Sequence, residues 1–524
     1  MTRSKLIIIV SLFLVIFDNI RFFTNTLNVY PLIQKNMPFL ISLAVLITCI
    51  NIIILALISN RYILKPVIIS LFLSASLAAY FMDTYDIIID DSMITNILNT
   101  DYNEMTELID KKLLLYLFTL GIAPSIIVYK TKITRHSLKK EIISKCSLFG
   151  CSLILPAVIL FTFGDFYASF FREHKPLRYY TNPDYYLYSI GKFIGNSAKK
   201  ETVPLKKIAL DATMPPSTSH KLIIFVVGES ARADHFSLNG YSRKTNPLLE
   251  KEAVINFTNV WSCGTSTAYS VPCLFSIYKQ SDFSIDQAST TENILDVLQR
   301  SGVSVLWLDN NSDSKGVANR IPYTSYRTTR TNPVCDSECR DIGMLANLQA
   351  YINAHQKKDI FIVLHQMGNH GPAYYKRYPS EFEKFTPTCQ TNQLEQCSRE
   401  EINNAYDNAL LYTDYFLSRI ISLLKKNTRF EAAMLYISDH GESLGENGLY
   451  LHGYPYLIAP DSQTHVPLVI WFNKNFENRL NSEHLNAIAD IRLSHDNIFH
   501  SILGLIGIKT QSYNKKLDIF SHAE

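Results

Sequence analysis

The chain of 524 residues is too long for one compact domain, and its length fits two or three domains. Apolar residues make up 47% of it and charged residues 19%, which excludes a disordered chain and is unusual for a fully soluble enzyme. The formal net charge of +3 predicts no bulk electrostatic attraction to nucleic acid, so we expect no nucleic-acid partner.

Long apolar runs dominate residues 1–166, and each approaches the ~20 residues that cross a bilayer core. The runs lie at 6–24, 38–59, 64–82, 113–129 and 146–166. Helices buried in a soluble protein are the alternative, but five such runs in succession are hard to bury otherwise. The first run lacks a small-residue cleavage site and further runs follow it, which argues against a cleavable signal peptide. The sequence therefore predicts a transmembrane domain of five helices.

The charges between these runs predict how the membrane domain is oriented. Lysine and arginine gather at 3–5, 61–65 and 130–145, whereas the segment 83–107 is acidic. Because positive charge stays on the cytoplasmic side, we expect the N-terminus in the cytoplasm and everything beyond about 170 outside. The acidic loop then also lies outside, and we expect a helix in it near 90–110.

A connector is expected over residues 167–205, between the last apolar run and the change in pattern that follows. Its aromatic residues suit a membrane surface, with lysine and arginine between them: Tyr179, Tyr180, Tyr185, Tyr186, Tyr188 and Phe193. A plain linker is the alternative, and the sequence does not decide between the two.

From 206 to 524 short apolar runs alternate with stretches of helical periodicity. The expected strands are Lys221–Val227, Val303–Leu308, Ile360–Leu364, Ala433–Ile437 and Val466–Phe472. The expected helices are Asn293–Arg300, Gly343–Ala354 and Arg399–Lys425. This alternation predicts a C-terminal α/β domain with a mostly parallel sheet.

The nine cysteines divide in the same way as the rest of the sequence. Cys49, Cys146 and Cys151 lie in apolar stretches, where we expect reduced thiols inside the membrane. The other six lie in the outer part, where an oxidising compartment permits disulfides, and six cysteines allow 15 pairings. Proximity along the chain favours the pairs Cys263–Cys273, Cys335–Cys339 and Cys389–Cys397.

Acidic, histidine and amide side chains follow four of the predicted strands. They are Glu229, then Asp309, Asn310 and Asn311, then His365 and His370, and then Asp439 and His440, with His452 a short loop further on. In open α/β sheets, ligands bind beyond the carboxyl ends of the strands. The set as a whole therefore predicts a binding site at one edge of the sheet, although each residue alone is better read as a surface acid or a capped core histidine.

Glutamate, aspartate and histidine together suit zinc. Asp439 and His440 are adjacent on a tight turn that lets both reach one ion, and Glu229 adds a third ligand from a neighbouring strand. A catalytic metal keeps one exchangeable position, and the segment 263–273 offers hydroxyl groups for it.

The segment 263–273 runs from a glycine-hydroxyl turn into apolar residues that are able to open a helix. A helix N-terminus favours negative charge, and a metal makes a nearby hydroxyl ionise more easily into a nucleophile. A Ser/Thr-rich capping turn is the alternative. Spacing alone does not choose the nucleophile among Thr265, Ser266 and Thr267.

Five longer segments together resemble a known family. They read Gly-Glu-Ser-Ala-Arg-Ala-Asp-His, Cys-Gly-Thr-Ser-Thr-Ala-Tyr-Ser-Val-Pro-Cys, Asp-Asn-Asn-Ser-Asp-Ser-Lys-Gly-Val, His-Gln-Met-Gly-Asn-His-Gly-Pro and Ser-Asp-His-Gly-Glu-Ser-Leu-Gly-Glu-Asn-Gly. The outer domain resembles the alkaline phosphatase superfamily. The whole chain resembles the phosphoethanolamine transferases that modify lipid A, including the mobile colistin resistance enzymes.

The resemblance implies roles for individual residues. It makes Thr267 the nucleophile and maps the tight zinc site onto Glu229, Thr267, Asp439 and His440. It maps contacts to phosphoethanolamine onto Thr265, Asn311, Lys315, His370 and His452, and either of these two histidines is expected to move the proton. His370 and His452 are also candidates for a second, weaker zinc, and His465 ranks lower because relatives differ there. Asn96, Thr100 and Glu104, with helical spacing in the acidic loop, are expected to help hold lipid, or else to form a solvated helix face.

The implied reaction moves phosphoethanolamine from phosphatidylethanolamine to a lipid A phosphate through a phospho-threonine. Such a product carries less negative charge and binds polymyxins such as colistin less well. We expect a monomer in the bacterial inner membrane, with its catalytic domain in the periplasm. Transfer to a core sugar of lipopolysaccharide or to another periplasmic glycan is the open alternative.

Three other interpretations of the function are disfavoured. A sulfatase needs a Cys-x-Pro-x-Arg or Ser-x-Pro-x-Arg segment, which 263–273 lacks. A glycerol-phosphate transferase similar to lipoteichoic acid synthase fits poorly with the three short cysteine pairs. A receptor that retains an inactive domain of the superfamily is disfavoured by the intact set of Glu229, Thr267, Asp439 and His440.

Overall fold

The computed structural model describes residues 1–60, 62–100, 105–106, 108–134, 137–172, 174–198, 204–215, 219–477, 480 and 482–522. The chain forms two compact units. The first comprises Met1–Ile94 and Ile109–Lys200, and the second comprises Thr95–Leu108 and Glu201–Glu524. We refer to them as the membrane unit and the outer unit.

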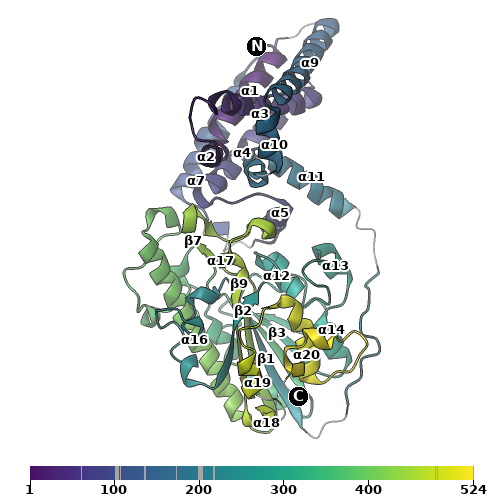
Figure 1. The fold of residues 1–524 in the computed structure, drawn as a ribbon, viewed down its shortest axis with the longest axis vertical. Coiled ribbons are helices and arrows are strands. Elements are labelled where there is room, and N and C mark those ends of the chain that lie inside the picture. Colours follow the sequence, from purple (N-terminus) through teal and green to yellow (C-terminus); the bar gives the residue numbers. More distant parts are fainter. Residues whose placement is uncertain are drawn as a thin grey trace. The chain divides into compact units, whose positions relative to one another are not determined.

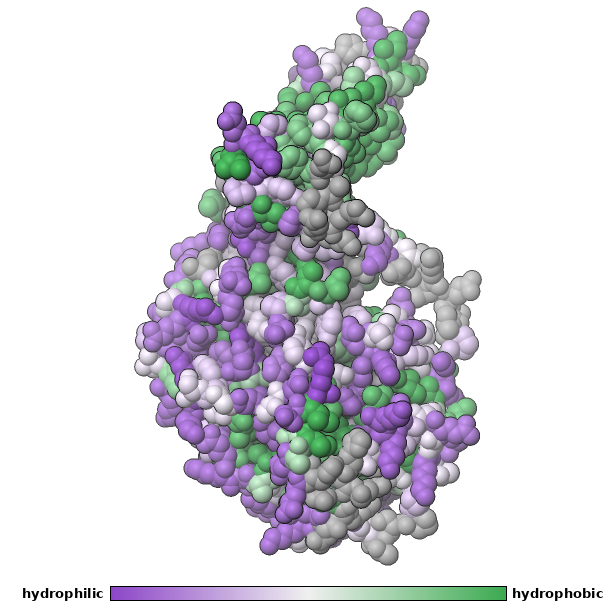
Figure 2. Space-filling model, viewed as in Figure 1, coloured by the Kyte–Doolittle hydropathy of each residue, from purple (hydrophilic) through white to green (hydrophobic). Residues whose placement is uncertain are grey.

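The membrane unit is helical. Its main helices are α1 (Arg3–Phe17), α2 (Ile20–Val29), α3 (Met37–Ile58), α4 (Leu64–Tyr85), α7 (Lys111–Tyr116), η1 (Leu117–Ile122), α8 (Ala123–Lys130) and α9 (Leu138–Thr162). Among the described residues, four helices are long and apolar enough to cross a membrane, or five if α1 and α2 form one broken span. One of the four is the continuous run of α7, η1 and α8. The expectation of about five apolar helices is confirmed, and Figure 2 shows the predominantly hydrophobic surface of these helices.

The first expected span, 6–24, differs from a single helix. Helices α1 and α2 meet at an angle of 57°. At the break, Asn19 Nδ2 donates to the Leu14 carbonyl at 2.9 Å, and Asn19 Oδ1 accepts from the Asn182 backbone N–H at 2.8 Å. When a side chain forms hydrogen bonds with backbone groups in this way, it interrupts the regular hydrogen bonding of the helix. Hydropathy alone does not reveal such a break.

The connector forms helices within the membrane unit. They are α10 (Gly164–Arg172), η2 (Lys175–Tyr180) and α11 (Asp184–Ala198). Tyr186 is 4% exposed, and its hydroxyl lies 2.7 Å from Ser74 Oγ on α4. Tyr188 is 65% exposed, so the aromatic residues of the connector divide between the interior and the surface.

The acidic loop contains α5 (Asp91–Asn99). Asn96 lies in this helix, and Thr100 follows its end, where the Thr100 hydroxyl donates to the Asn96 carbonyl at 2.8 Å. Glu104, the third residue of the expected set, lies outside the described residues. From Thr95 to Leu108 the loop belongs to the outer unit.

An eight-stranded sheet in the order β10-β2-β9-β6-β1-β5-β3-β4 organises the outer unit (Figure 1). Its strands are β1 (His220–Gly228), β2 (Val254–Trp261), β3 (Ser304–Asp309), β4 (Tyr323–Ser325), β5 (Ile360–His365), β6 (Phe430–Ser438), β9 (His465–Phe472) and β10 (Leu493–Ser494). Strand β9 runs antiparallel to β2 and β6, and the other pairings are parallel. The mostly parallel α/β domain is therefore confirmed. Each of the five expected strands is present, and the sequence analysis missed β2 and the short strands.

Helices cover both faces of this sheet. They include α12 (Thr267–Leu274), α14 (Ile294–Arg300), α15 (Leu348–Ala354), α16 (Arg399–Lys426) and α20 (Ile498–Ile506). Figure 1 shows α16 on one side of the sheet and α14 and α20 on the other. Because both faces are covered, β1 is buried from Leu222 to Val227, which explains its unbroken apolar run.

The register of the central strands decides which side chains meet at the carboxyl edge. Gly228 at the end of β1 pairs with Ser438 at the end of β6. On the other side of β1, Val227 pairs with His365 of β5, and His365 pairs with Asp309 of β3. Four strand ends therefore meet at one edge, where the residues that follow them form the site.

Candidate active site

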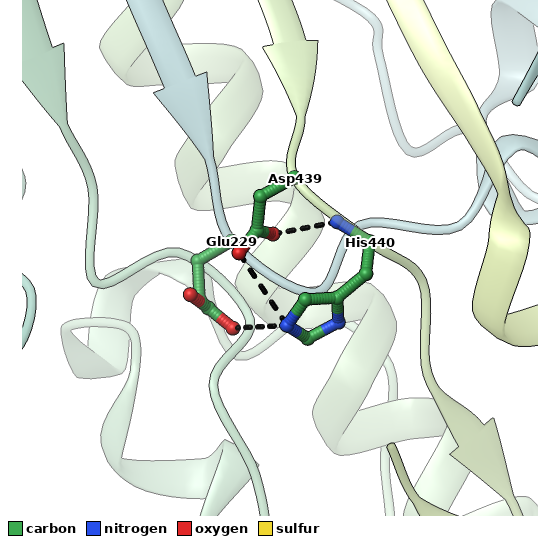
Figure 3. A group of neighbouring side chains, drawn as sticks. All are labelled: Glu229, Asp439 and His440. Atoms are coloured by element: carbon green, nitrogen blue, oxygen red, sulfur yellow. Dashed lines mark hydrogen bonds and ion pairs between the residues drawn. The ribbon is translucent and has the colours of Figure 1, made fainter. Parts of the chain in front are cut away.

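Glu229, Asp439 and His440 form a compact buried group, which we call the metal group (Figure 3). Because Gly228 and Ser438 are paired, the next residue of each strand, Glu229 and Asp439, emerges side by side. One ligand atom from each of the three side chains lies within 4.8 Å of the others. Their exposed fractions are 1%, 0% and 0%. The sequence-predicted ligands thus come together in a site closed to bulk water.

Hydrogen bonding at the far side of the imidazole orients His440. Its Nδ1 lies 2.8 Å from the Gly441 carbonyl, which requires a proton on Nδ1 and leaves Nε2 with its lone pair. Nε2 lies 3.4 Å from Glu229 Oε1 and 3.4 Å from Asp439 Oδ2. The ring therefore presents an acceptor, as a metal ligand must.

The metal group fits a divalent cation. Asp439 Oδ2 is buried and has no hydrogen-bond partner of normal geometry among the residues that the structure describes. Burial and the neighbouring Glu229 carboxylate raise the pKa of Asp439 well above its usual value, and burial lowers the pKa of His440 to about 3. Two packed carboxylates beside a neutral imidazole are costly without a cation and are a normal donor set for zinc.

Thr267 places its hydroxyl against the metal group. It is the first residue of α12 and 8% exposed. Its Oγ1 donates to Glu229 Oε2 at 3.0 Å and lies 3.4 Å from His440 Nε2. Thr265 is turned to a different partner, since its hydroxyl donates to the Tyr454 carbonyl at 2.6 Å. Of these two hydroxyls, the one that the resemblance selected is in contact with the metal group.

Three disulfides join Cys263 to Cys273, Cys335 to Cys339 and Cys389 to Cys397. The pairing expected from proximity is confirmed. The first bond encloses Thr267 and the opening of α12, so it restrains the backbone that carries this hydroxyl. Cys49, Cys146 and Cys151 are free cysteines; Cys49 is buried, and the other two are exposed on α9.

The turn after β1 is held in a strained conformation. Ser230 has φ 55°, in the left-handed region that a residue with a Cβ adopts only under constraint. Tyr406 on α16 supplies the constraint, because its hydroxyl donates to the Ser230 carbonyl at 2.6 Å and accepts from the Arg232 backbone at 2.9 Å. Ser230 Oγ in turn donates to Glu229 Oε1 at 2.7 Å, which fixes that carboxylate.

Asn311 supports the other oxygen of Glu229. Its side-chain amide donates to Glu229 Oε2 at 2.9 Å and to the Gln366 carbonyl at 2.7 Å. Asp309 Oδ1 accepts from the Asn311 backbone N–H at 2.9 Å, and Asp309 Oδ2 lies 3.0 Å from His365 Nδ1 in a buried pair. The structure thus places Asn311 on the metal group, where it positions Glu229, and its contact with substrate stays a prediction.

Two histidines and a glutamate lie beside the metal group. The His452 ring centre is 4.2 Å from that of His440 and 6.0 Å from that of His370. Glu442, fully buried, lies with Oε2 3.1 Å from His452 Nδ1. Lys315 has φ 49°, and its Nζ donates to the Ser312 carbonyl at 3.1 Å. Their roles toward substrate also stay predictions.

His465 lies outside the metal group. It begins β9, its Nε2 is 2.8 Å from the Thr258 carbonyl, and its ring stacks on Trp261 with centres 5.1 Å apart. These contacts describe a histidine that secures the edge of the sheet, in keeping with its lower rank in the sequence analysis.

Sequence reasoning missed several residues that build the site. Glu442 lies within Ser-Asp-His-Gly-Glu, so the motif held a signal that we did not use. His495 accepts from the Cys263 backbone N–H at 3.2 Å and lies 3.0 Å from the Ser438 carbonyl, which ties the disulfide loop to the end of β6. Burial lowers the pKa of His495 to about 4, so the ring is neutral. Nothing in the sequence around His495 or Tyr406 points to these contacts.

Comparisons with known proteins agree with this architecture. A family model described as Sulfatase matches residues 221–508, and one described as Phosphoethanolamine transferase EptA/EptB matches residues 47–198. Phosphatidylethanolamine transferase Mcr-2 of Escherichia coli is 44% identical over 514 residues, which cover 95% of this chain and 94% of that protein. Phosphoethanolamine transferase EptA of Escherichia coli (strain K12) is 38% identical over 513 residues, which cover 96% and 93%.

One solved structure aligns with the chain from end to end. It is the integral membrane protein lipooligosaccharide phosphoethanolamine transferase A (EptA) from Neisseria meningitidis. The two superpose with a TM-score of 0.96 at 34% identity, over 100% of this chain and 99% of that one. The similarity therefore includes the membrane unit as well as the sheet.

Proposed function

The chain belongs to the phosphoethanolamine transferase family, and from this premise we propose its reaction in detail. It moves phosphoethanolamine from phosphatidylethanolamine to a phosphate of lipid A, through a covalent intermediate on Thr267. The protein acts as a monomer at the outer face of the bacterial inner membrane. The observation that carries this proposal is the Thr267 hydroxyl, 3.0 Å from Glu229 and 3.4 Å from His440 at the start of α12.

The cofactor in this proposal is zinc, held by Glu229, Thr267, Asp439 and His440. The donor set supports it, because it combines two buried carboxylates and an imidazole whose lone pair faces them. When bound, zinc supplies Lewis acidity that lowers the pKa of a hydroxyl and offsets the negative charge of a phosphoryl group. A second, weaker zinc is proposed near His370 and His452, whose ring centres are 6.0 Å apart.

In the first displacement Thr267 Oγ1 forms a bond to the donor phosphorus, and the bond from phosphorus to the diacylglycerol oxygen breaks. Glu229 Oε2 already accepts the hydrogen bond of this hydroxyl and takes its proton. The leaving diacylglycerol oxygen takes a proton from His370 or His452. The N-terminal end of α12 and the Lys315 ammonium favour the negative charge of the phosphoryl oxygens.

In the second displacement an oxygen of the lipid A phosphate attacks the phospho-threonine, and the bond from phosphorus to Thr267 Oγ1 breaks. The same histidine accepts the proton of the acceptor, and Thr267 recovers its own. The product gains an amine, which reduces the net negative charge of the membrane surface and weakens binding of polymyxins. The apolar membrane unit supports this proposal, because donor and acceptor are both lipids.

Mass spectrometry of lipid A from cells that express the full chain tests the proposal. The wild type should add phosphoethanolamine to lipid A, and the purified enzyme should carry it on Thr267 when acceptor is withheld. Thr267→Ala should abolish both signals, whereas Ser289→Ala, an exposed hydroxyl in the same unit, should change neither. Transfer by Thr267→Ala would assign the nucleophile elsewhere. Modification of a core sugar in place of lipid A would replace the acceptor.

A further inference from the structure

A pocket of about 360 Å³ lies in the outer unit beside the proposed catalytic histidines. We call it the Arg327 pocket, and its charged and ring-bearing wall consists of Arg327, Asp336, Glu338, His370, Lys376 and Arg377. Thr106, from the segment Thr95–Leu108, also contributes to the wall. This volume is in the range of pockets that hold small ligands, and of its wall the reaction described above uses only His370.

The carboxylates of the wall are neutralised by neighbouring arginines. Asp336 pairs with Arg340 at 2.6 Å, and Glu338 pairs with Arg377. The loop that carries both acids is closed by the bond between Cys335 and Cys339, so their positions are restrained. The wall carries three cations, Arg327, Lys376 and Arg377, against these two acids, so positive charge is in excess.

Arg327 is a partly buried cation of this wall. Burial and the like charge of Arg377 lower the pKa of Arg327 to about 10, against the opposing effect of Glu338. A guanidinium held against a second guanidinium binds a phosphate well, because its planar donors match phosphate oxygens and the anion relieves the repulsion.

Contacts link this pocket to the reactive hydroxyl. His370 belongs to its wall, and the ring centres of His370 and His452 are 6.0 Å apart. The His452 ring is 4.2 Å from His440, whose Nε2 is 3.4 Å from Thr267 Oγ1. Arg377 Nε also donates to the His370 carbonyl at 2.6 Å, so a cation of the pocket positions one of these histidines.

The order of the two displacements requires a place for the acceptor. An in-line attack on the phospho-threonine brings the acceptor oxygen to the position that the diacylglycerol oxygen has left. The phosphoethanolamine still occupies the space between Thr267 and the histidines at that moment. The acceptor headgroup must therefore lie beyond the histidines, where the Arg327 pocket is.

We propose that the Arg327 pocket binds the phosphorylated sugar headgroup of the acceptor lipid, with Arg327 and Lys376 as ligands of an acceptor phosphate. This inference rests on the proposed function and adds the site that selects the acceptor. The donor phosphoethanolamine binds at Thr267 and the histidines, so the two substrates use different cations.

The test uses full-length enzyme in detergent micelles and separates the two half-reactions. Release of diacylglycerol from phosphatidylethanolamine without acceptor reports the first, and transfer to purified lipid A over a range of concentrations reports the second. Arg327→Gln should raise the KM for lipid A about 10- to 100-fold, as expected for loss of a charge-assisted hydrogen bond. Diacylglycerol release should fall less than about threefold, which also reports that the variant is folded.

Two variants and one substrate serve as controls. Arg327→Lys should regain most of the acceptor affinity, and Arg330→Gln, an exposed residue of the same loop outside the pocket wall, should change neither half-reaction. In the wild type, lipid A stripped of its phosphates should inhibit transfer to intact lipid A only weakly. Its inhibition constant should not be lower in Arg327→Gln than in the wild type.

Each remaining outcome overturns the inference. An unchanged KM for lipid A would remove Arg327 from acceptor binding. An equal loss of diacylglycerol release would make the pocket a donor site, for example for the ethanolamine ammonium beside Asp336 and Glu338. A wild type that releases no diacylglycerol would instead refute the proposed function, so the two failures are distinguishable.

Discussion

The metal group and the Arg327 pocket differ in how far the protein fixes the positions of their side chains before a ligand binds. Asp439 and His440 are fully buried, and backbone and side-chain bonds set the direction of each ligand atom. The pocket is an open space of about 360 Å³ with charges on its wall. In the proposed reaction, the groups around Thr267 are therefore positioned before substrate arrives, whereas the proposed acceptor site is an open space bounded by charged side chains.

The largest effect is expected at the metal group itself. Asp439→Asn removes a buried negative charge that faces the proposed ion, so metal content should fall with activity, the latter by about 10³-fold or more. Elemental analysis of the purified protein and single-turnover transfer measure the two quantities. Glu250→Gln, which removes an exposed carboxylate paired with Lys244, should leave both unchanged. Full metal content in Asp439→Asn would contradict the assignment of the ligands.

A substitution at Glu442 tests the link between the two regions, because Glu442 contacts His452, whose ring lies near His440 of the metal group and His370 of the pocket wall. It is fully buried, and its carboxylate accepts the Nδ1 hydrogen bond of His452 at 3.1 Å. Glu442→Gln keeps the shape but removes the charge that orients and stabilises a protonated ring, so kcat should fall about 10- to 100-fold. The metal content and the KM for lipid A should stay within twofold of the wild type. A change in KM with kcat unaltered would assign Glu442 to binding rather than to proton transfer.

The smallest effect is expected at Gly368, which packs under Glu229. Gly368 has φ +51°, and a Cβ there would lie 2.9 Å from the Glu229 carbonyl oxygen. Gly368→Ala should lower the free energy of unfolding by about 1–2 kcal/mol and reduce activity several-fold, because it displaces Glu229. Thermal unfolding and transfer assays measure these changes.

Gly240→Ala is the matched control for Gly368→Ala. Gly240 also has a positive φ, +90°, but a Cβ there would meet no atom within 4 Å. This variant should therefore lose stability without losing activity beyond what its unfolded fraction explains. Equal losses of specific activity in the two variants would show that backbone strain, and not contact with Glu229, controls the reaction.

Periodicity and spacing predicted the parts of this molecule that repeat a local pattern. The run at Lys221–Val227 is buried on both faces in β1, so its continuous apolar pattern was enough to identify it. Strand β2 (Val254–Trp261) was missed, because its side chains alternate between buried and half-buried positions, which weakens the apolar signal. The break between α1 and α2 depends on Asn182, a residue far along the chain, and no local pattern reveals it.

The residues of the site also divide into those that a local pattern predicts and those that only the folded structure brings together. Glu229, Asp439 and His440 were predicted because each follows a strand, and strands of a parallel sheet end at one edge. Choosing Thr267 over its neighbours needed the resemblance, because spacing does not report which hydroxyl a turn directs inward. The contact of Tyr406 with the Ser230 turn joins distant parts of the chain, and only the folded structure brings them together.

The pairing of Gly228 with Ser438 also has a consequence for when the metal group is completed. Ser230 and Asp439, which meet at the site, are 209 positions apart in the sequence. Asp439 and His440 are adjacent, but Glu229 joins them only when β1 and β6 pair, so the full ligand set exists only after the central strands have closed. A polypeptide folded under a chelator should thus reach its finished sheet and become active when the ion is supplied afterwards.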